Sequence, residues 1–529
     1  MRKNRKSFTV IKTLILLFFA VSLLFPLAAM LLNLVEVDVL HILSTKVFVH
    51  ATLNSLSTTL TATVLSICLA TLLAWCLARS KVKFKNAFAV LLTLPMLIPS
   101  ISHGMGLIVL FGKNGVMNNL LHTQVDIYGF WGIVIGSIMY SFPVAFLMLY
   151  DIFKYEDYSV YESAQVLGIP KRNQFLSITL PYLRKPMISV FFATFTLIFT
   201  DYGVPLMIGG KFMTLPVYMY TEVLGLFNFG KGTVVALILI IPALIAFFFD
   251  LLNKDVGTLS FVTKPFVLKK NRTRDAVSYL IIVVTVVAIL LPIAAFALLT
   301  FVQKYPIDMS LTLHNIQQAF DLSAGSYLFH SLIIALFTAA IGVFISYITA
   351  YLTARSRGKS SKALHLISIT SLAVPGIVLG LSYAVFFKTS FLYGTIAMLV
   401  LVNTMHFFAS PYLLAYNAMA KINPNFEAVS KTLGIKRWRL IKDVFVPQTT
   451  GTIAEMFSYF FVNSMITISA VSFLSSTRNM PVSLLIPQFE GQMLLECSAF
   501  VSLLILAVNI VIKVLIYLVK QRAQRKQTA

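Results

Sequence analysis

Two acidic side chains of this sequence lie inside long apolar stretches, where a buried charge is unusual. Asp201 stands in the segment 200–205 (TDYGVP), and Glu455 stands near the start of another apolar stretch. A carboxylate inside a membrane costs a few kcal/mol, so such residues are candidates for function. Asp201 could line or gate a pathway, or it could be hydrogen-bonded between packed helices. For Glu455, a structural role near the membrane surface is favoured.

Motifs for catalysis and for metal binding are missing from the sequence. An ATPase would need G-x-x-x-x-G-K-[ST], but the nearest approach, at 225–232, ends in Gly232 where the hydroxyl should stand. The three cysteines lie in apolar runs without metal-ligand spacing, and His103 and His406 are single histidines that favour packing. The sequence therefore predicts no catalytic residue, no metal site and no cofactor.

The composition indicates a membrane protein. Of the 529 residues, 58% are apolar and 12% are charged, whereas soluble proteins carry roughly a quarter charged residues. This excludes an ordinary cytosolic enzyme, a disordered chain and a nucleic-acid-binding domain. A helix needs about 20 apolar residues to cross a bilayer. We expect an all-α, polytopic membrane protein with about twelve such spans, at 11–34, 54–78, 87–111, 128–150, 187–208, 233–253, 276–301, 328–352, 363–387, 392–417, 452–474 and 497–519.

The basic residues predict how the spans are oriented. The first apolar run is too long for a signal peptide, so we interpret it as a retained span. With the N-terminus inside, the inner segments hold 35 of the 42 Lys and Arg residues and the outer loops hold seven. This asymmetry follows the positive-inside rule. The net charge of +23 then marks a face that meets anionic lipid headgroups, not nucleic acid. The sequence predicts a bacterial plasma (inner) membrane protein with both termini in the cytoplasm.

The sequence repeats itself in two halves. The segment 78–80 (ARS) recurs at 354–356, and Pro99 recurs as Pro375, both 276 residues later. Because six spans is an even number, both halves face the same way. This predicts a pseudo-two-fold axis along the membrane normal and a pathway between the halves. We expect a first repeat at 1–253, a basic cytoplasmic linker at 254–275 and a second repeat at 276–529.

In each half, the longest inner loop, about 155–185 and about 421–448, carries the same pattern. Residues 161–181 read YESAQVLGIPKRNQFLSITLP, and residues 426–447 read FEAVSKTLGIKRWRLIKDVFVP. Each predicts two short helices separated by a glycine in the left-handed conformation, Gly168 or Gly434. Pro181 and Pro447 are expected to end the second helix and redirect the chain. The loops could simply lie on the headgroups, but the same device in both halves favours a paired external partner.

These loops resemble the EAA loop, E-A-A-x-x-x-G followed by I-x-L-P, of the membrane subunits of ABC importers. In the first loop the positions that match are Glu162, Ala164, Gly168, Ile178, Leu180 and Pro181, and in the second they are Gly434, Val444 and Pro447. In the second loop Ala428 stands at the usual glutamate position, and Glu427 precedes it. The resemblance implies coupling helices that dock on a cytoplasmic ATPase dimer, and a binding protein that delivers cargo outside.

The segments that follow the two loops are candidates for the pathway. FTDYGVPLMIGG (199–210) and TISAVSFLSS (467–476) end the fifth and eleventh spans, which makes Asp201, Tyr202, Thr467 and Ser469 candidate pathway residues. Both stretches resemble the 2-aminoethylphosphonate branch of fused permeases, with ferric-iron and thiamine permeases as close alternatives. A secondary transporter with two parallel six-span halves is the rival class, although it would normally need a chain of buried acids and bases.

Overall fold

The structure, a computed structural model, describes residues 2–252, 264, 266, 268, 271–356 and 358–528. Most of the described chain is helical, as predicted. The helices of the first half are α1 (Arg2–Phe19), η1 (Ala20–Leu24), α2 (Phe25–Leu32), η2 (Asn33–Glu36), α3 (Val39–Ser44), α4 (Lys46–Arg79), α5 (Lys85–Thr93), η3 (Leu94–Leu97), α6 (Ser100–Phe111), α7 (Val116–Leu121), α8 (Phe130–Lys154), α9 (Ser159–Val166), α10 (Lys171–Gln174), η4 (Phe175–Thr179), α11 (Leu180–Phe199), α12 (Gly203–Ile208), α13 (Leu215–Tyr220), η5 (Thr221–Gly225) and α14 (Phe229–Leu252).

The second half repeats this order and adds a hairpin after its first helix. Its elements are α15 (Arg272–Phe301), β1 (Val302–Lys304), β2 (Asp308–Leu311), α16 (His314–Asp321), α17 (Ala324–Ala354), α18 (Lys359–Thr370), η6 (Ser371–Ala373), α19 (Gly376–Phe386), α20 (Ile396–His406), α21 (Ala409–Ala420), α22 (Asn425–Thr432), α23 (Arg437–Leu440), η7 (Ile441–Phe445), α24 (Val446–Gln448), α25 (Thr450–Ile466), η8 (Val482–Leu484), α26 (Leu485–Gly491) and α27 (Leu495–Thr528). Strands β1 and β2 pair antiparallel. The predicted linker 254–275 lies largely outside the described residues.

The described chain has eight helices long and apolar enough to cross a membrane, or up to eleven if each of three bent pairs is one span. The predicted span at 452–474 corresponds to α25, which has 17 residues and ends at Ile466. The prediction of an all-α protein with many spans is therefore confirmed.

Four predicted spans are wrong as continuous helices, and one of them, 392–417, bends by 52° between α20 and α21. The stretch 87–111 bends by 98° between η3 and α6, and the stretch 363–387 bends by 104° between η6 and α19. Both bends fall at the repeated prolines, where Ile98 and Val374 are extended, because a residue before proline is pushed out of the helical region. The span at 187–208 also breaks, since α11 ends at Phe199 and α12 begins at Gly203. The chain thus places buried helix ends within each half.

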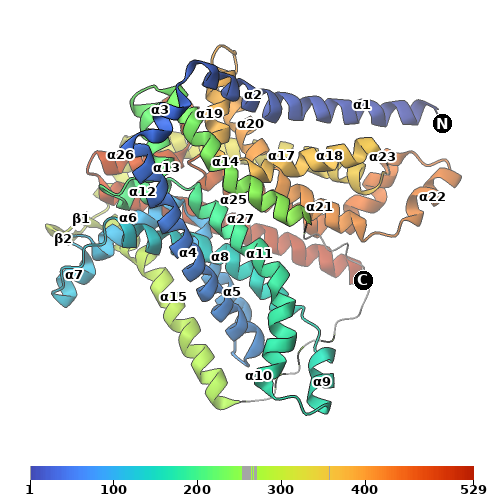
Figure 1. The fold of residues 1–529 in the computed structure, drawn as a ribbon, viewed down its shortest axis with the longest axis horizontal. Coiled ribbons are helices and arrows are strands. Elements are labelled where there is room, and N and C mark those ends of the chain that lie inside the picture. Colours follow the sequence, from blue (N-terminus) through green and yellow to red (C-terminus); the bar gives the residue numbers. More distant parts are fainter. Residues whose placement is uncertain are drawn as a thin grey trace.

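The first helix of each half packs on the other half. Helix α2 lies against α19, while α15 lies against α4, α5 and α6. Specific contacts hold the start of the chain against the second half. The Tyr383 hydroxyl donates to the Ser22 carbonyl over 2.5 Å, and the rings of Phe19 and Phe408 meet edge to face at 5.0 Å. In Figure 1, α1 runs beside α17 and α18, and α15 runs beside α4 and α5. Neither half is therefore an independent bundle.

The two halves form arms that diverge from a shared region. Figure 1 shows the hairpin β1–β2 and helix α7 at the shared end, while α9 and α10 end one arm and α22 and α23 end the other. Both predicted coupling loops thus lie away from the hairpin, and they lie far apart. The chain termini are on the same side as α23.

Candidate functional site

Each predicted coupling loop begins with a helix that ends at a left-handed glycine. Gly168 has φ +68° and Gly434 has φ +66°. After α9, the Ile169 N–H donates to the Ala164 carbonyl over 2.9 Å and the Gly168 N–H donates to the Gln165 carbonyl over 3.1 Å. The second loop has the same pair of bonds after α22. This is the Schellman pattern, in which glycine avoids the Cβ penalty, and it confirms the predicted turn.

The expected role of Pro181 and Pro447 is wrong. Neither proline ends the second helix of its loop, because the chain continues through a π turn, η4 or η7, into the next helix. In these turns the Leu180 N–H donates to the Phe175 carbonyl and the Val446 N–H donates to the Ile441 carbonyl. The π turn has already changed the regular hydrogen-bond ladder, so a proline placed directly after it can enter the first turn of the next helix.

In the first half, a buried ion pair ties the loop to the end of α4. Arg79 pairs with Glu156, and the Tyr161 hydroxyl donates to the same carboxylate. Tyr161 also lies 2.6 Å from the Thr179 hydroxyl. Burial and the bond to Glu156 raise the pKa of the Tyr161 phenol, so the phenol keeps its proton and remains a donor. These contacts join the end of α4, the start of α9 and the π turn.

In the second half, the repeated arginine uses a different glutamate. Arg355, the counterpart of Arg79, donates to both oxygens of Glu427 over 2.6 and 2.5 Å and also donates to the Ile422 carbonyl over 2.8 Å. Ala428 is exposed beside this pair. The shift of the acidic residue from 428 to 427 therefore points it inward, to Arg355.

Glu162, at the motif's glutamate position in the first loop, is half-exposed and meets a residue of the linker. Lys264 Nζ lies 2.7 and 2.6 Å from its two carboxylate oxygens. Of the other motif positions, Ala164 is buried, while Ile178 and Val444 are partly buried. Among the matched motif positions, Ala164 thus packs inside its loop, while Leu180, Pro181 and Pro447 are exposed.

Apolar side chains that are not part of the motif form the outward faces of the loops. In the first loop Val166 is 88% exposed and Leu167 is 75% exposed, and in the second Leu433 and Trp438 are exposed by 67% and 55%. Exposed apolar residues grouped at one place mark interaction sites. Sequence reasoning did not single out the exposure of these side chains, although Leu167 and Leu433 directly precede the two glycines.

At the centre of the molecule, Asp201 caps helix ends at the break of the fifth span. Its carboxylate accepts from the Ser100 hydroxyl at the start of α6 over 2.6 Å and from the Val204 N–H of α12 over 3.0 Å. A carboxylate at a helix N-terminus satisfies free N–H groups and suits the helix dipole. Of the two sequence alternatives, this geometry favours the hydrogen-bonded one.

Tyr202 crosses from the first half to the second. Its hydroxyl lies 2.5 Å from the Ser472 hydroxyl and 3.4 Å from the Ile468 carbonyl, and its ring stacks on Tyr220 at 4.9 Å. Tyr202 is completely buried. The breaks of the fifth and eleventh spans therefore meet, and Ser472 joins the candidate residues that the sequence had suggested.

Serine and glycine occupy opposite positions in the two halves: Ser100 corresponds to Gly376, and Gly203 corresponds to Ser469. A Cβ on Gly203 would lie 2.4 Å from Ser100 Oγ, and a Cβ on Gly376 would lie 2.6 Å from Ser469 Oγ and 2.8 Å from His406 Nε2. The first half thus carries serine at the start of α6 and the second carries it in the break. Thr467 is buried, and its carbonyl accepts from Ser483 over 2.8 Å. Asp201 and Tyr202 thus belong to the first break and Ser469 and Thr467 to the second, which Tyr202 contacts at Ile468 and Ser472; their role in a pathway stays a prediction.

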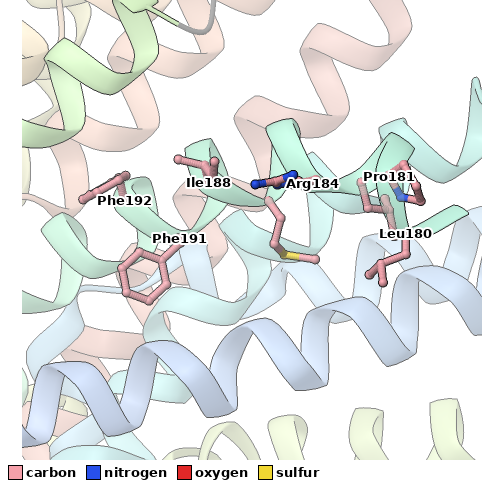
Figure 2. A pocket seen from close by; sticks show the side chains of 8 residues that line it. Leu180, Pro181, Arg184, Ile188, Phe191 and Phe192 are labelled. Carbon is pink, nitrogen blue, oxygen red and sulfur yellow. The ribbon is translucent and has the colours of Figure 1, made fainter. Parts of the chain in front are cut away.

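Other candidates lie outside this centre. Glu455 pairs with Lys520 of α27, which fits the structural role expected for it. A groove of about 690 Å³ runs along α11. Figure 2 shows the side chains that line it, which are Leu180, Pro181, Leu183, Arg184, Met187, Ile188, Phe191 and Phe192. Since these residues all belong to one helix, the groove is a surface feature of the first half and not the space between the halves.

The family described as the binding-protein-dependent transport system inner membrane component matches this chain twice, at residues 66–256 and 342–525. The chain belongs to this family. The two matches begin 276 residues apart, the same spacing that relates Arg79 to Arg355, so the tandem repeat is confirmed. As a member of this family with many apolar helices, the chain is a multi-pass membrane protein.

Curated relatives within this family align over most of the chain. A protein of Haemophilus influenzae and one of Actinobacillus pleuropneumoniae, both named as ferric transport system permease proteins, are each 24% identical over 423 residues. The alignments cover 76% of this chain and 67% and 61% of those relatives. A molybdenum transport system permease protein of Azotobacter vinelandii is 30% identical over 152 residues, which is 28% of this chain and 67% of the relative.

Proposed function

We propose that this chain is the membrane-spanning permease of an ABC importer and that α9 and α22, with the turns that follow them, dock on the two subunits of a cytoplasmic ATPase. The observation that carries this proposal is the pair of matched loops. Each has a Schellman turn, an arginine–glutamate pair behind it and exposed apolar residues in front of it. Both loops and both termini are then cytoplasmic, as the distribution of basic residues predicts.

The arrangement supports a rigid-body mechanism. The loops lie at the ends of diverging arms (Figure 1), while the breaks near Tyr202 and Ser472 are in contact. Binding of ATP would draw the ATPase subunits together and move the loops with them. Because the first helix of each half is packed on the other half, this movement would separate the central breaks and open the pathway outward. ATP hydrolysis would reverse the movement.

The rival, a secondary transporter, is less well supported. A proton-coupled pathway needs acids and bases within reach of one another. In the described part of the chain, Asp201 and Glu455, the acidic residues singled out from the sequence, serve as a helix cap and as a partner of Lys520. Such a transporter also has no need for two matched loops.

The cargo that we propose is a small solute delivered by an extracytoplasmic binding protein. The names of the two long-matching relatives support ferric iron. The segments 199–210 and 467–476 resemble the 2-aminoethylphosphonate branch and support a phosphonate. Both candidates should be assayed with the same preparation.

Reconstitution tests this function. The chain is placed in vesicles with the ATPase and binding protein encoded beside its gene, and uptake of ferric iron and of 2-aminoethylphosphonate is measured with ATP inside. We expect uptake of one of them only when the ATPase and ATP are present. Uptake on a proton gradient without the ATPase would contradict the proposal and support the rival class.

A further inference from the structure

The segment that joins the two halves contacts the first coupling loop. Its residue Lys264 accepts a hydrogen bond from the Tyr158 N–H over 2.9 Å through its carbonyl. The Lys264 N–H donates to the Asp157 carboxylate over 3.1 Å, and the Lys264 ammonium holds both oxygens of Glu162. Three parts of one lysine therefore contact the start of α9.

Phe266, two residues later, is enclosed by side chains of the same loop. Its ring lies 4.7 Å from the ring of Tyr158 and 4.9 Å from that of Tyr161, and the Arg79 guanidinium lies 3.2 Å above it. Arg79 is the residue that also pairs with Glu156. Phe266 thus reaches the ion pair that anchors the loop. An exposed lysine–glutamate pair alone would add little to the stability of this contact. The Phe266 ring and the two backbone hydrogen bonds of Lys264 hold the segment in place.

The contact changes what the first loop can present to a partner. With Lys264 on Glu162, the loop's glutamate is neutralised inside this chain, as Glu427 is neutralised by Arg355 in the second loop. The face that remains is apolar and basic: Val166 and Leu167 are exposed, and Lys171 and Arg172 follow the turn. An ATPase groove that receives this face should have an apolar floor and acidic residues at its edge.

We propose that Lys264 and Phe266 are part of the ATPase-docking surface of the first half, where they neutralise Glu162 and hold α9 in position for an apolar, acidic-edged groove. The inference rests on the proposed function. It makes the two coupling loops unequal, because among the residues that the structure describes, α22 has its glutamate held by α17 and not by the linker.

Charge exchange tests this surface. Full-length variants Lys264→Glu, Glu162→Lys and the double exchange are reconstituted with the ATPase and binding protein, and cargo-stimulated ATP hydrolysis is measured. We expect the rate of cargo-stimulated ATP hydrolysis to fall at least fivefold in each single variant. In the double exchange, this rate should return to within twofold of wild type. Phe266→Ala should also lower this rate at least fivefold. Lys83→Glu, at an exposed lysine near the end of α4, is the matched control and should behave as wild type.

A second measurement does not depend on activity. Glu162→Cys combined with Lys264→Cys should be joined by a bifunctional thiol cross-linker that spans a lysine–glutamate pair, and the cross-link should still form when the ATPase is bound. The acidic edge is tested by Lys171→Glu with Arg172→Glu, which should weaken ATPase binding at least tenfold.

The possible outcomes separate the inference from the function. If Lys264→Glu is as active as wild type, or if Glu162→Lys is inactive and the double exchange does not rescue it, Glu162 serves the ATPase directly and the inference is wrong. A missing cross-link between positions 162 and 264, or unchanged ATPase binding after reversal of Lys171 and Arg172, would also overturn it. If the wild-type chain binds no ATPase, the proposed function is wrong, and the inference is wrong with it.

Discussion

The hydroxyl of Tyr202 lies 2.5 Å from the hydroxyl of Ser472, so a hydrogen bond joins the helix break of the first half to the helix break of the second. The bond is buried, and the Ser472 hydroxyl also contacts the Ile468 carbonyl. If the halves separate at these breaks during transport, the bond must open in every cycle. Tyr202 would then act as a latch for the closed state.

Tyr202→Phe should weaken this latch. The substitution removes the hydroxyl but keeps the ring that stacks on Tyr220. A lost hydrogen bond of this kind costs about 1 kcal/mol, which corresponds to about a fivefold change in an equilibrium. We expect ATP hydrolysis without binding protein to rise about fivefold in the reconstituted complex. Tyr220→Phe is the control, and an unchanged basal rate in Tyr202→Phe would contradict the latch.

Glu427→Ala should destabilise the second half. The Arg355 side chain is 7% exposed, and removal of one partner from a buried ion pair costs about 3 kcal/mol. We expect a clear decrease in thermal stability, measured by the unfolding of purified protein in detergent. Ala428→Glu, at the neighbouring exposed position, should leave the stability within about 0.5 kcal/mol of wild type. Equal effects of both changes would show that the inward contact of Glu427 is unimportant.

Substitutions of Gly168 separate conformation from contact. A Cβ at this position would meet no atom within 4 Å, so the cost of Gly168→Ala is the left-handed backbone alone, about 1 kcal/mol. We expect Gly168→Ala to reduce transport partly. Gly168→Pro should abolish transport while leaving the spans inserted, because proline cannot adopt a positive φ. Insertion is checked by labelling of cysteines placed in the outer loops, and normal uptake by the proline variant would refute the docking role.

Asp201→Asn tests whether the central carboxylate acts as a cap or as a charge. An asparagine keeps an acceptor for the Ser100 hydroxyl or the Val204 N–H, whereas Asp201→Ala removes the cap at a cost of about 1 kcal/mol. We expect the asparagine variant to retain most of the ATP-driven uptake and the alanine variant to lose much of it. If both variants are equally inactive, the negative charge itself serves transport.

Structural features that are set by neighbouring residues could be predicted from the sequence. Features that depend on contacts between residues far apart in the chain could not. The glycine turns follow from Gly168 and Gly434, and the repeat follows from Pro99 and Pro375. The bends at these two prolines were missed because the apolar runs continue across them, although proline itself was the available signal. The error at Pro181 arose because the π turn before it cannot be inferred from composition.

The ion pairs behind the loops show this limit most clearly. Arg79 and Glu156 are 77 positions apart, and Lys264 and Glu162 are 102 apart, so spacing alone could not pair them. The arginines themselves carried a signal, because Arg79 and Arg355 recur at the spacing of the repeat. Two buried arginines at equivalent helix ends each require an acidic partner, and Glu427 was the nearest candidate in the second loop.

Cross-linking of both loops to the ATPase tests the central claim most directly. Cysteines are introduced singly at Leu167 and Leu433, the exposed residues that precede the two glycines, and a photoactivatable maleimide is attached in membranes that contain the assembled complex. We predict that labels at both positions cross-link to the ATPase. A label at Leu311, in the β1–β2 hairpin, should give no cross-link to the ATPase. A complex that transports cargo while neither Leu167 nor Leu433 cross-links to the ATPase would contradict the account.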